Sequence, residues 1–198
     1  MVTALVVHSH PCNPSLGSTL RDTAVGALGD AGYSVDLLDL YAEQFDPVEP
    51  RPSTGSTAAG SGSDTQQLAD HIARLRACKL LVLVYPTWWG AQPAMLTGWL
   101  DRVWRDPDAV APTGRLRPNK TVFGNIDRVV VITTHGSPRW INALQGESGK
   151  RLLQRGMRRA VGSHCKVDWV ALYDLDHVRP GQTDAFIGRV REHLARIA

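Results

Sequence analysis

The chain lacks the features that mark membrane, secreted and nucleic-acid-binding proteins. No stretch approaches the roughly 18 to 20 consecutive apolar residues of a membrane-spanning helix, and no basic segment precedes the apolar residues near the start, as it would in a secretory signal. The net charge of +3 is too small to indicate nucleic-acid binding, and small acidic electron carriers would be strongly negative. We therefore expect a cytoplasmic protein with no membrane insertion and no nucleic-acid partner.

Paired cysteines and familiar nucleotide-binding motifs are missing as well. Cys12, Cys78 and Cys165 are widely spaced and form no CxxC pair, so neither a zinc site nor an iron-sulfur cluster is indicated. His8 and His10 lie on one face of an extended segment, but no nearby acidic or cysteine ligand completes a metal site, and we expect no metal. The GxGxxG fingerprint and the nucleoside-triphosphate loop are both absent.

The apolar pattern predicts one α/β domain over residues 1–198. A chain of 198 residues that is 43% hydrophobic fits a single core. Stretches of helical period alternate with short runs rich in Val, Leu and Ile, which predict five buried parallel strands. These runs are Ala4–His8, Ser34–Leu38, Lys79–Tyr85, Val129–Thr134 and Lys166–Leu172. We expect a flavodoxin-like, doubly wound sheet of order 2-1-3-4-5 with helices on both faces.

Two surface features are expected outside this core. The stretch from Pro50 to Asp64 is rich in Gly, Ser and Pro and should be a mobile loop. Basic residues share one face of a helix whose other face is apolar, and a solvated face is the simplest interpretation. They are Lys150, Arg151, Arg155, Arg158 and Arg159.

Ligands of such sheets bind beyond the carboxyl ends of the strands, so the loops after the first, third and fourth strands should form the site. The first loop reads HSHPCNPSLGSTL and runs directly into a helix. Ser15, Ser18 and Thr19 can cap that helix, and Gly17 permits close backbone approach, which is suited to a phosphate group. An ordinary serine cap explains the same residues equally well.

The second loop is the most informative segment. It takes the buried third strand into YPTWWG and then into a helix that opens near Pro93. This segment resembles the motif by which NAD(P)H:quinone oxidoreductases, and their bacterial relatives in the flavodoxin-like family 2, surround the isoalloxazine ring. The first loop is similar to the histidine-proline-serine pattern of that family, and VVVITTHGS is similar to its third flavin loop.

The resemblance implies an NAD(P)H dehydrogenase (quinone)-like oxidoreductase. Its cofactor would be FAD, with FMN as the alternative, its electron donor NADH or NADPH, and its acceptor a quinone or similar small molecule. Members of the family are usually homodimers. The cofactor-binding residues it implies are His10, Ser15, Leu16, Gly17, Ser18, Pro86, Thr87, Trp88, Trp89, Gly90, Thr133, Thr134, Gly136 and Ser137. Trp99 and Trp104 instead lie on an apolar helix stripe and should pack in the core.

The sequence departs from the family at three positions. A TTGG pattern has become Thr133-Thr134-His135-Gly136, which puts a Cβ and an imidazole where glycine is free to adopt positive φ. Asn142 and Ser148 stand where members carry a Tyr and a His. A histidine in a flavin loop can donate a proton to a reduced quinone, so we predict His135 as the catalytic residue. A solvent-facing histidine is the alternative.

Two other functions compete with this interpretation. Relatives of this family serve as ancillary subunits of potassium-efflux systems, and the missing Tyr and His would suit such a flavin-binding regulatory protein. A receiver-like signalling domain would need an acidic pair after the first strand and an Asp after the third. His8, His10, Tyr85 and Pro86 occupy those places, which argues against it.

Overall fold

The computed structural model describes residues 2–49, 62–104 and 123–197. Its centre is a five-stranded sheet of order β2-β1-β3-β4-β5, in which every neighbouring pair is parallel. This confirms the predicted topology, and each predicted strand boundary agrees to within one residue. The strands are β1 (Thr3–His8), β2 (Ser34–Asp39), β3 (Leu80–Pro86), β4 (Arg128–Thr134) and β5 (Lys166–Leu172).

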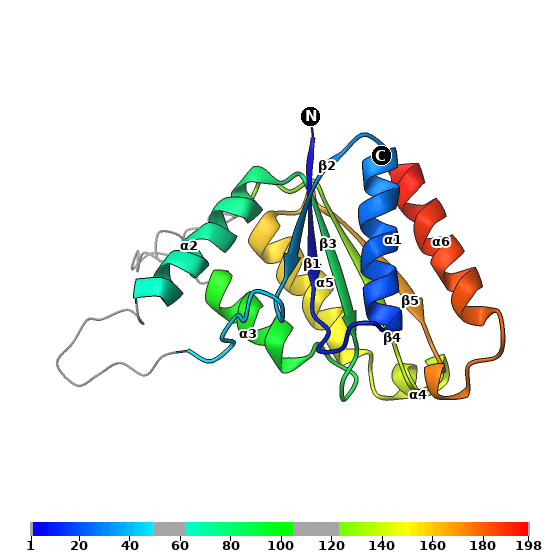
Figure 1. Ribbon diagram of the computed structural model, residues 1–198. Helices are drawn as coiled ribbons and strands as arrows, with labels where there is room; N and C mark the ends of the chain where they lie inside the picture. Colours follow the sequence, from blue (N-terminus) through cyan, green and yellow to red (C-terminus); the bar gives the residue numbers. More distant parts are fainter. Residues whose placement is uncertain (1, 50–61, 105–122, 198) are drawn as a thin grey trace.

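Helices cover both faces of the sheet (Figure 1). One face packs against α1 (Leu16–Asp30) and α6 (Gln182–Ile197). The other packs against α2 (Gly62–Ala77), α3 (Ala94–Val103) and α5 (Ser148–Val161). Two short elements not expected from the sequence, α4 (Arg139–Leu144) and the 3₁₀ turn η1 (Leu175–His177), lie at the carboxyl end of the sheet. None of the described helices is both long and apolar enough to cross a membrane.

The core on the α2, α3 and α5 face contains a buried polar link. Trp99 is fully buried, as predicted, and its indole N–H donates to Nδ1 of His71 at 3.2 Å. The other ring nitrogen of His71 lies 2.9 Å from a Glu43 carboxylate oxygen. Trp104 packs against the same core and is partly buried. Both tryptophans therefore belong to the core.

The expected loop from Pro50 to Asp64 lies mostly outside the described residues. Its last three residues differ from the prediction, because α2 already begins at Gly62. The carboxylate of Asp64 lies in the first turn of α2, where the helix dipole favours negative charge, and it accepts a hydrogen bond from Arg102 at 2.7 Å. That ion pair favours helix where the Gly- and Ser-rich composition alone indicated loop.

The basic face of α5 is exposed at Arg151, Arg155, Arg158 and Arg159, in agreement with a solvated surface. Lys150 differs, because its side chain is partly buried and its Nζ lies 3.1 Å from Glu147 Oε2. This pair borders the cavity described next, so Lys150 belongs to the site and not to the solvated face.

Candidate cofactor site

A cavity of about 500 Å³ opens at the carboxyl ends of the strands. This is where ligands bind in open parallel sheets. Six of its lining residues were predicted from the sequence: Thr87, Trp89, Gly90, His135, Gly136 and Ser137. Seven were not predicted as site residues: Asn142, Gln145, Glu147, Ser148, Lys150, Trp169 and Tyr173. Asn142 and Ser148 in this second set are the positions where the resemblance places a Tyr and a His. The other five come from segments around α4, the start of α5 and β5 that carry no recognised motif.

One wall of the cavity is a tight hairpin at Trp88–Ala91. The N–H of each end residue donates to the carbonyl oxygen of the other at 3.0 Å, and the central residues Trp89 and Gly90 have φ of 53° and 72°. Positive φ at both central positions is the pattern of a type I′ turn. A bulky residue rarely adopts positive φ, but Trp89 does so at the tip of the turn. Its side chain is fully exposed, with a relative exposure of 104%.

The turn decides which backbone donors a ligand can use. The N–H of Thr87 donates to the carbonyl oxygen of Thr134 at 2.8 Å, and the Thr87 hydroxyl donates to the same oxygen at 2.9 Å. The N–H groups of Thr87 and Trp88 are therefore already hydrogen-bonded within the protein. Within the described chain, Trp89 and Gly90 keep theirs free of an internal acceptor. Of the backbone N–H groups of Thr87–Gly90 that were expected to bind the ligand, two are therefore available.

The hairpin rests on the first turn of α5. A Cβ at Gly149 would lie 2.8 Å from both the Ala91 Cα and the Gly90 carbonyl oxygen, so only glycine permits this approach. The amide of Gln92 donates to the Gly149 carbonyl at 3.0 Å and ties the two segments together. The hairpin wall is thus held in place by packing and by a hydrogen bond.

The cavity lining also includes His135. The imidazole is 6% exposed and stacks on the Tyr173 ring at a centroid distance of 4.4 Å, with Trp169 at 6.3 Å. Neither His135 nor Gly136 has positive φ, so the backbone strain that the glycine replacement suggested does not arise. A Cβ at Gly136 would meet a carboxylate oxygen of Asp176 at 2.7 Å, which explains the glycine there.

The hydrogen bonds of Asn142 assign the protonation of His135. The Asn142 amide nitrogen lies 2.9 to 3.1 Å from three oxygens of Ser137 and Pro138, so it is the donor end. Its Oδ1 therefore accepts, and Nδ1 of His135, at 2.9 Å, carries the proton in the neutral ring. Burial lowers the pKa of His135 below its usual value, although Asn142 acts to raise it. At neutral pH, Nε2 is an acceptor.

The first loop starts α1 as predicted. The Ser15 hydroxyl accepts from the Ser18 N–H at 3.1 Å, and the Ser18 hydroxyl accepts from the Ser15 N–H at 2.8 Å, which is a capping box. Thr19 differs, because its hydroxyl donates back to the Ser15 carbonyl at 3.2 Å. A Cβ at Gly17 would lie 3.1 Å from the His10 ring. Gly17 is therefore needed for the position of His10.

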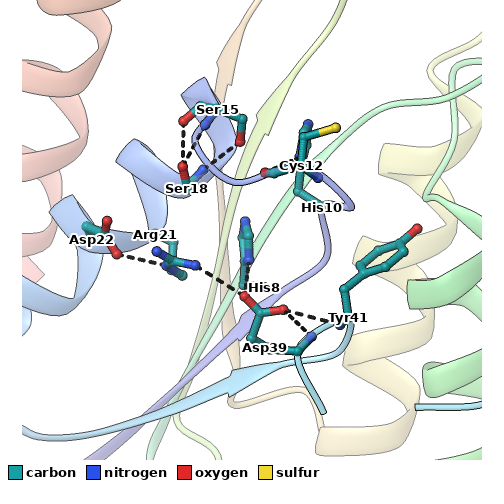
Figure 2. Close-up of polar contacts among 10 residues, drawn as sticks. His8, His10, Cys12, Ser15, Ser18, Arg21, Asp22, Asp39 and Tyr41 are labelled. Atoms are coloured by element: carbon teal, nitrogen blue, oxygen red, sulfur yellow. Dashed lines mark hydrogen bonds and ion pairs between the residues drawn. The ribbon is translucent and has the colours of Figure 1, made fainter. Parts of the chain in front are cut away.

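A buried pair lies beneath this loop (Figure 2). Nδ1 of His8 is 2.8 Å from Oδ2 of Asp39, and the Arg21 guanidinium reaches the same oxygen at 3.2 Å. The Oδ1 atom of Asp39 accepts the N–H groups of Tyr41 and Ala42 at 3.2 and 3.1 Å. The link between His8 and Asp39 was not predicted from the sequence.

The cavity contains only part of the predicted set. Its lining includes no described residue of the first loop, and it does not include Pro86, Trp88, Thr133 or Thr134. In the part of the chain that the structure describes, six buried side-chain polar atoms have no partner. Four of these lie at or just after the carboxyl ends of β1 and β4: His8 Nε2, Ser9 Oγ, Thr133 Oγ1 and His135 Nε2. Buried polar groups normally have partners, so this edge is suited to a polar ligand such as a flavin.

Known proteins share this chain's sequence pattern. It is 28% identical over 197 residues to NAD(P)H dehydrogenase [quinone] 1 of Rattus norvegicus, covering 89% of this chain and 70% of that one. It is 32% identical over 115 residues to a ribosyldihydronicotinamide dehydrogenase-like protein of Penicillium crustosum. That match covers half of this chain and 43% of the fungal protein, so the chain spans less than half of that relative's length.

Solved structures share the fold. An NAD(P)H:quinone oxidoreductase from Methanothermobacter marburgensis superposes with a TM-score of 0.75 at 20% identity, covering 99% of this chain and 96% of the other. An FMN-dependent NADH-azoreductase from Bacillus anthracis, solved in complex with FMN, gives 0.71 at 15% identity with full coverage of both chains. The model of the Flavodoxin_2 family, described as flavodoxin-like fold, matches residues 2–196. The chain therefore belongs to this family of flavodoxin-like proteins, which includes the NAD(P)H:quinone oxidoreductases.

Proposed function

We propose that the chain is a flavin-dependent NAD(P)H oxidoreductase that reduces a quinone or a similar small electrophile by two electrons. The observation that carries this proposal is the cavity at the strand ends, which adjoins buried polar atoms that lack internal partners. A flavin bound there supplies the hydride chemistry, accepting from NAD(P)H and passing two electrons to the acceptor. The protein positions the ligands and excludes water.

The predicted residues divide into a phosphate side and a ring side. On the phosphate side, His10, Ser15, Leu16, Gly17 and Ser18 surround the start of α1, where N–H groups and the helix dipole favour an anion. On the ring side, Pro86–Gly90 would lie along one edge of the flavin and Thr133–Ser137 along the other. The N–H groups of Trp89 and Gly90 can stabilise negative charge on the ring.

His135 is the residue we assign to proton movement. Its Nε2 is buried, lacks an internal partner in the described chain and belongs to a ring that lines the cavity. In the neutral ring this atom accepts a hydrogen bond from a ligand. After protonation it can donate a proton to the reduced acceptor, so the donor role proposed from the sequence requires the imidazolium form.

The cofactor, the assembly and the compartment of the protein each have a supporting observation. FAD is our first expectation and FMN the alternative, which the FMN-dependent azoreductase supports. Exposed apolar side chains, Trp89, Trp140, Leu144 and Leu152, lie on the hairpin, α4 and α5, and support a homodimer built around the cavity. The three cysteines are free thiols, which supports the cytoplasm.

The test is reconstitution of flavin-free protein with FAD, FMN or riboflavin, followed by oxidation of NADH and NADPH with a soluble quinone. Quenched flavin fluorescence, a dissociation constant well below the millimolar range and quinone-dependent turnover are expected. No binding below millimolar flavin would end the proposal. Flavin binding without turnover would instead favour the regulatory subunit, a role that none of the reported relatives is named for.

A further inference from the structure

His8 is a buried titratable group that the proposed function leaves unused. Its side chain is 1% exposed at the end of β1, and its Nε2 has no partner within residues 2–49, 62–104 and 123–197. A buried ring nitrogen without a hydrogen bond costs stability. Such an atom is retained at a functional site when a ligand completes it.

The surroundings of His8 assign its protonation. Burial acts to raise the pKa of Asp39, but the Ala42 N–H and the His8 ring outweigh it, and the pKa is lowered overall. Asp39 is therefore a carboxylate that can only accept hydrogen bonds. The proton shared by the pair at 2.8 Å belongs to His8 Nδ1. In the neutral ring, Nε2 is consequently a bare lone pair.

That nitrogen points toward the start of α1. In Figure 2 the His8 ring stands between Asp39 on one side and the loop that carries His10 and Ser15 on the other. The His10 ring is stacked at a centroid distance of 6.4 Å. The capping box uses the N–H groups of Ser15 and Ser18 but leaves those of Leu16 and Gly17 directed out of the helix end.

We propose that His8 takes up a proton on Nε2 when a phosphate group binds at the start of α1 and donates that proton in a hydrogen bond to the phosphate, which makes cofactor affinity depend on pH. The inference rests on the proposed function and adds a titrating contact to it. The proton comes from solvent, the Nδ1 proton stays on the Asp39 side, and no electrons move. In a neutral His8, the lone pair of Nε2 would face the phosphate oxygens and repel them.

The charged and titratable groups that face His8 are consistent with proton uptake on Nε2 when phosphate binds. Asp39 comes from β2, Arg21 from α1 and His10 from the loop. Burial lowers the pKa of His8 below 6.5 in the free protein, although Asp39 acts to raise it, so the ring is mostly neutral near pH 7. Phosphate charge beside Nε2 raises the pKa in the complex. The negative charge of Asp39 then stabilises the imidazolium from its Nδ1 side.

The sign of the pH effect follows by linkage. Because binding takes up a proton, affinity falls as pH rises between the lowered pKa of the free protein and the raised pKa of the complex. The dissociation constant of FMN should rise by up to about tenfold per pH unit in this window. Measurements from pH 6.5 to 8.5 keep the FMN phosphate, with a second pKa of about 6, mostly dianionic. Riboflavin, which has no phosphate, should show no such rise.

The experiment measures dissociation constants of FMN, FAD and riboflavin by fluorescence across this range. In His8→Gln, whose amide donates without titrating, the slope for FMN and FAD should disappear. His164→Gln, in the exposed turn before β5 at the opposite end of the sheet, is the matched control and should keep the slope. An unchanged slope in His8→Gln, or an equal slope for riboflavin, overturns the inference.

A spectroscopic measurement on the unaltered protein covers the case in which His8→Gln fails to fold. Nitrogen-15 shifts of the His8 ring should show Nδ1–H alone in the free protein and protons on both nitrogens with FMN. A ring that stays neutral with FMN bound contradicts the inference while leaving the proposed function intact. If no flavin binds, the proposed function fails, and inorganic phosphate replaces FMN as the probe in the same spectra.

Discussion

Nδ1 of His135 lies 2.9 Å from Oδ1 of Asn142, so two positions at which the chain departs from its family are in direct contact. The resemblance places glycine at the first and tyrosine at the second. Here the smaller amide occupies the tyrosine position, and the imidazole stacks on Tyr173. The two departures form one unit, and the properties of His135 depend on Asn142.

Replacing His135 tests its proposed chemical role. His135→Ala should leave flavin binding within about threefold and lower the rate of acceptor reduction by roughly ten- to ten-thousand-fold, while hydride transfer from NAD(P)H changes much less. In the native protein this rate should fall as pH rises, because the lowered pKa of His135 leaves few protonated rings above pH 6.5. Rapid mixing separates the two half-reactions. Equal oxidative rates in wild type and variant from pH 5.5 to 8.5 would remove His135 from the mechanism.

Two glycines of α5 give a matched pair. Gly149→Ala should destabilise the protein by about 1–3 kcal/mol and weaken flavin binding, because its Cβ would press on Ala91 and the Gly90 carbonyl at 2.8 Å. Gly156→Ala meets nothing within 4 Å and should stabilise by about 0.5–1 kcal/mol through helix propensity. Urea unfolding measures both. Equal effects of the two substitutions would mean that the hairpin does not rest on α5.

Trp89 should show a conflict between stability and binding. Trp89→Asn places an Asn-Gly pair in the type I′ turn and should stabilise flavin-free protein by about 1 kcal/mol, since Trp89 has φ of 53° and buries no side chain. The melting temperature would rise by about 2–4 °C. Flavin binding should weaken by about 1–3 kcal/mol if the indole stacks on the ring.

The control is Val48→Ala, which shortens an exposed apolar side chain outside the cavity lining and outside the proposed dimer contact. It should leave flavin affinity unchanged. If flavin affinity stays constant in Trp89→Asn, the indole contacts something other than the flavin. A lower melting temperature in that variant would show that the turn geometry is not strained.

Acid should weaken the fold in a defined window. Burial lowers the pKa of His8, His71 and His135 in the folded protein. The unfolded chain, with histidine near pH 6.5, then binds more protons, so this stability is complete above pH 6.5 and is lost as pH falls through the folded pKa values. Each histidine contributes at most about 1.4 kcal/mol per pH unit.

Urea unfolding of flavin-free protein at pH 7.5, 6.5 and 5.5 measures this slope. His71→Gln removes one of the three buried rings and should reduce this slope by the share of that ring, while His8 and His135 keep theirs. A free energy of unfolding that is flat between pH 6.5 and 5.5 would mean that none of the buried rings stays neutral.

The sheet could be predicted because buried parallel strands are nearly continuous apolar runs, such as Leu80–Tyr85. The residues that line the cavity could be predicted only where a motif continued a strand, as at Thr87, Trp89 and Gly90. The stacking of His135 on Tyr173 and the pairing of His8 with Asp39 join residues 38 and 31 positions apart in the sequence. Side-chain contacts at such separation leave no local pattern. The α4 helix has six residues and no side-chain cap, so its periodicity was too short to detect.

Thiol placement gives this chain a built-in attachment point. Cys12 is exposed in the first loop, where its N–H donates to His10 at 3.0 Å. Cys78 and Cys165 are buried, and burial raises the pKa of Cys78 to about 12, so few thiolates form there. A maleimide fluorophore should therefore label Cys12 alone in the native protein. Its emission would report ligand arrival at the loop directly, including the arrival of ligands that have no colour of their own.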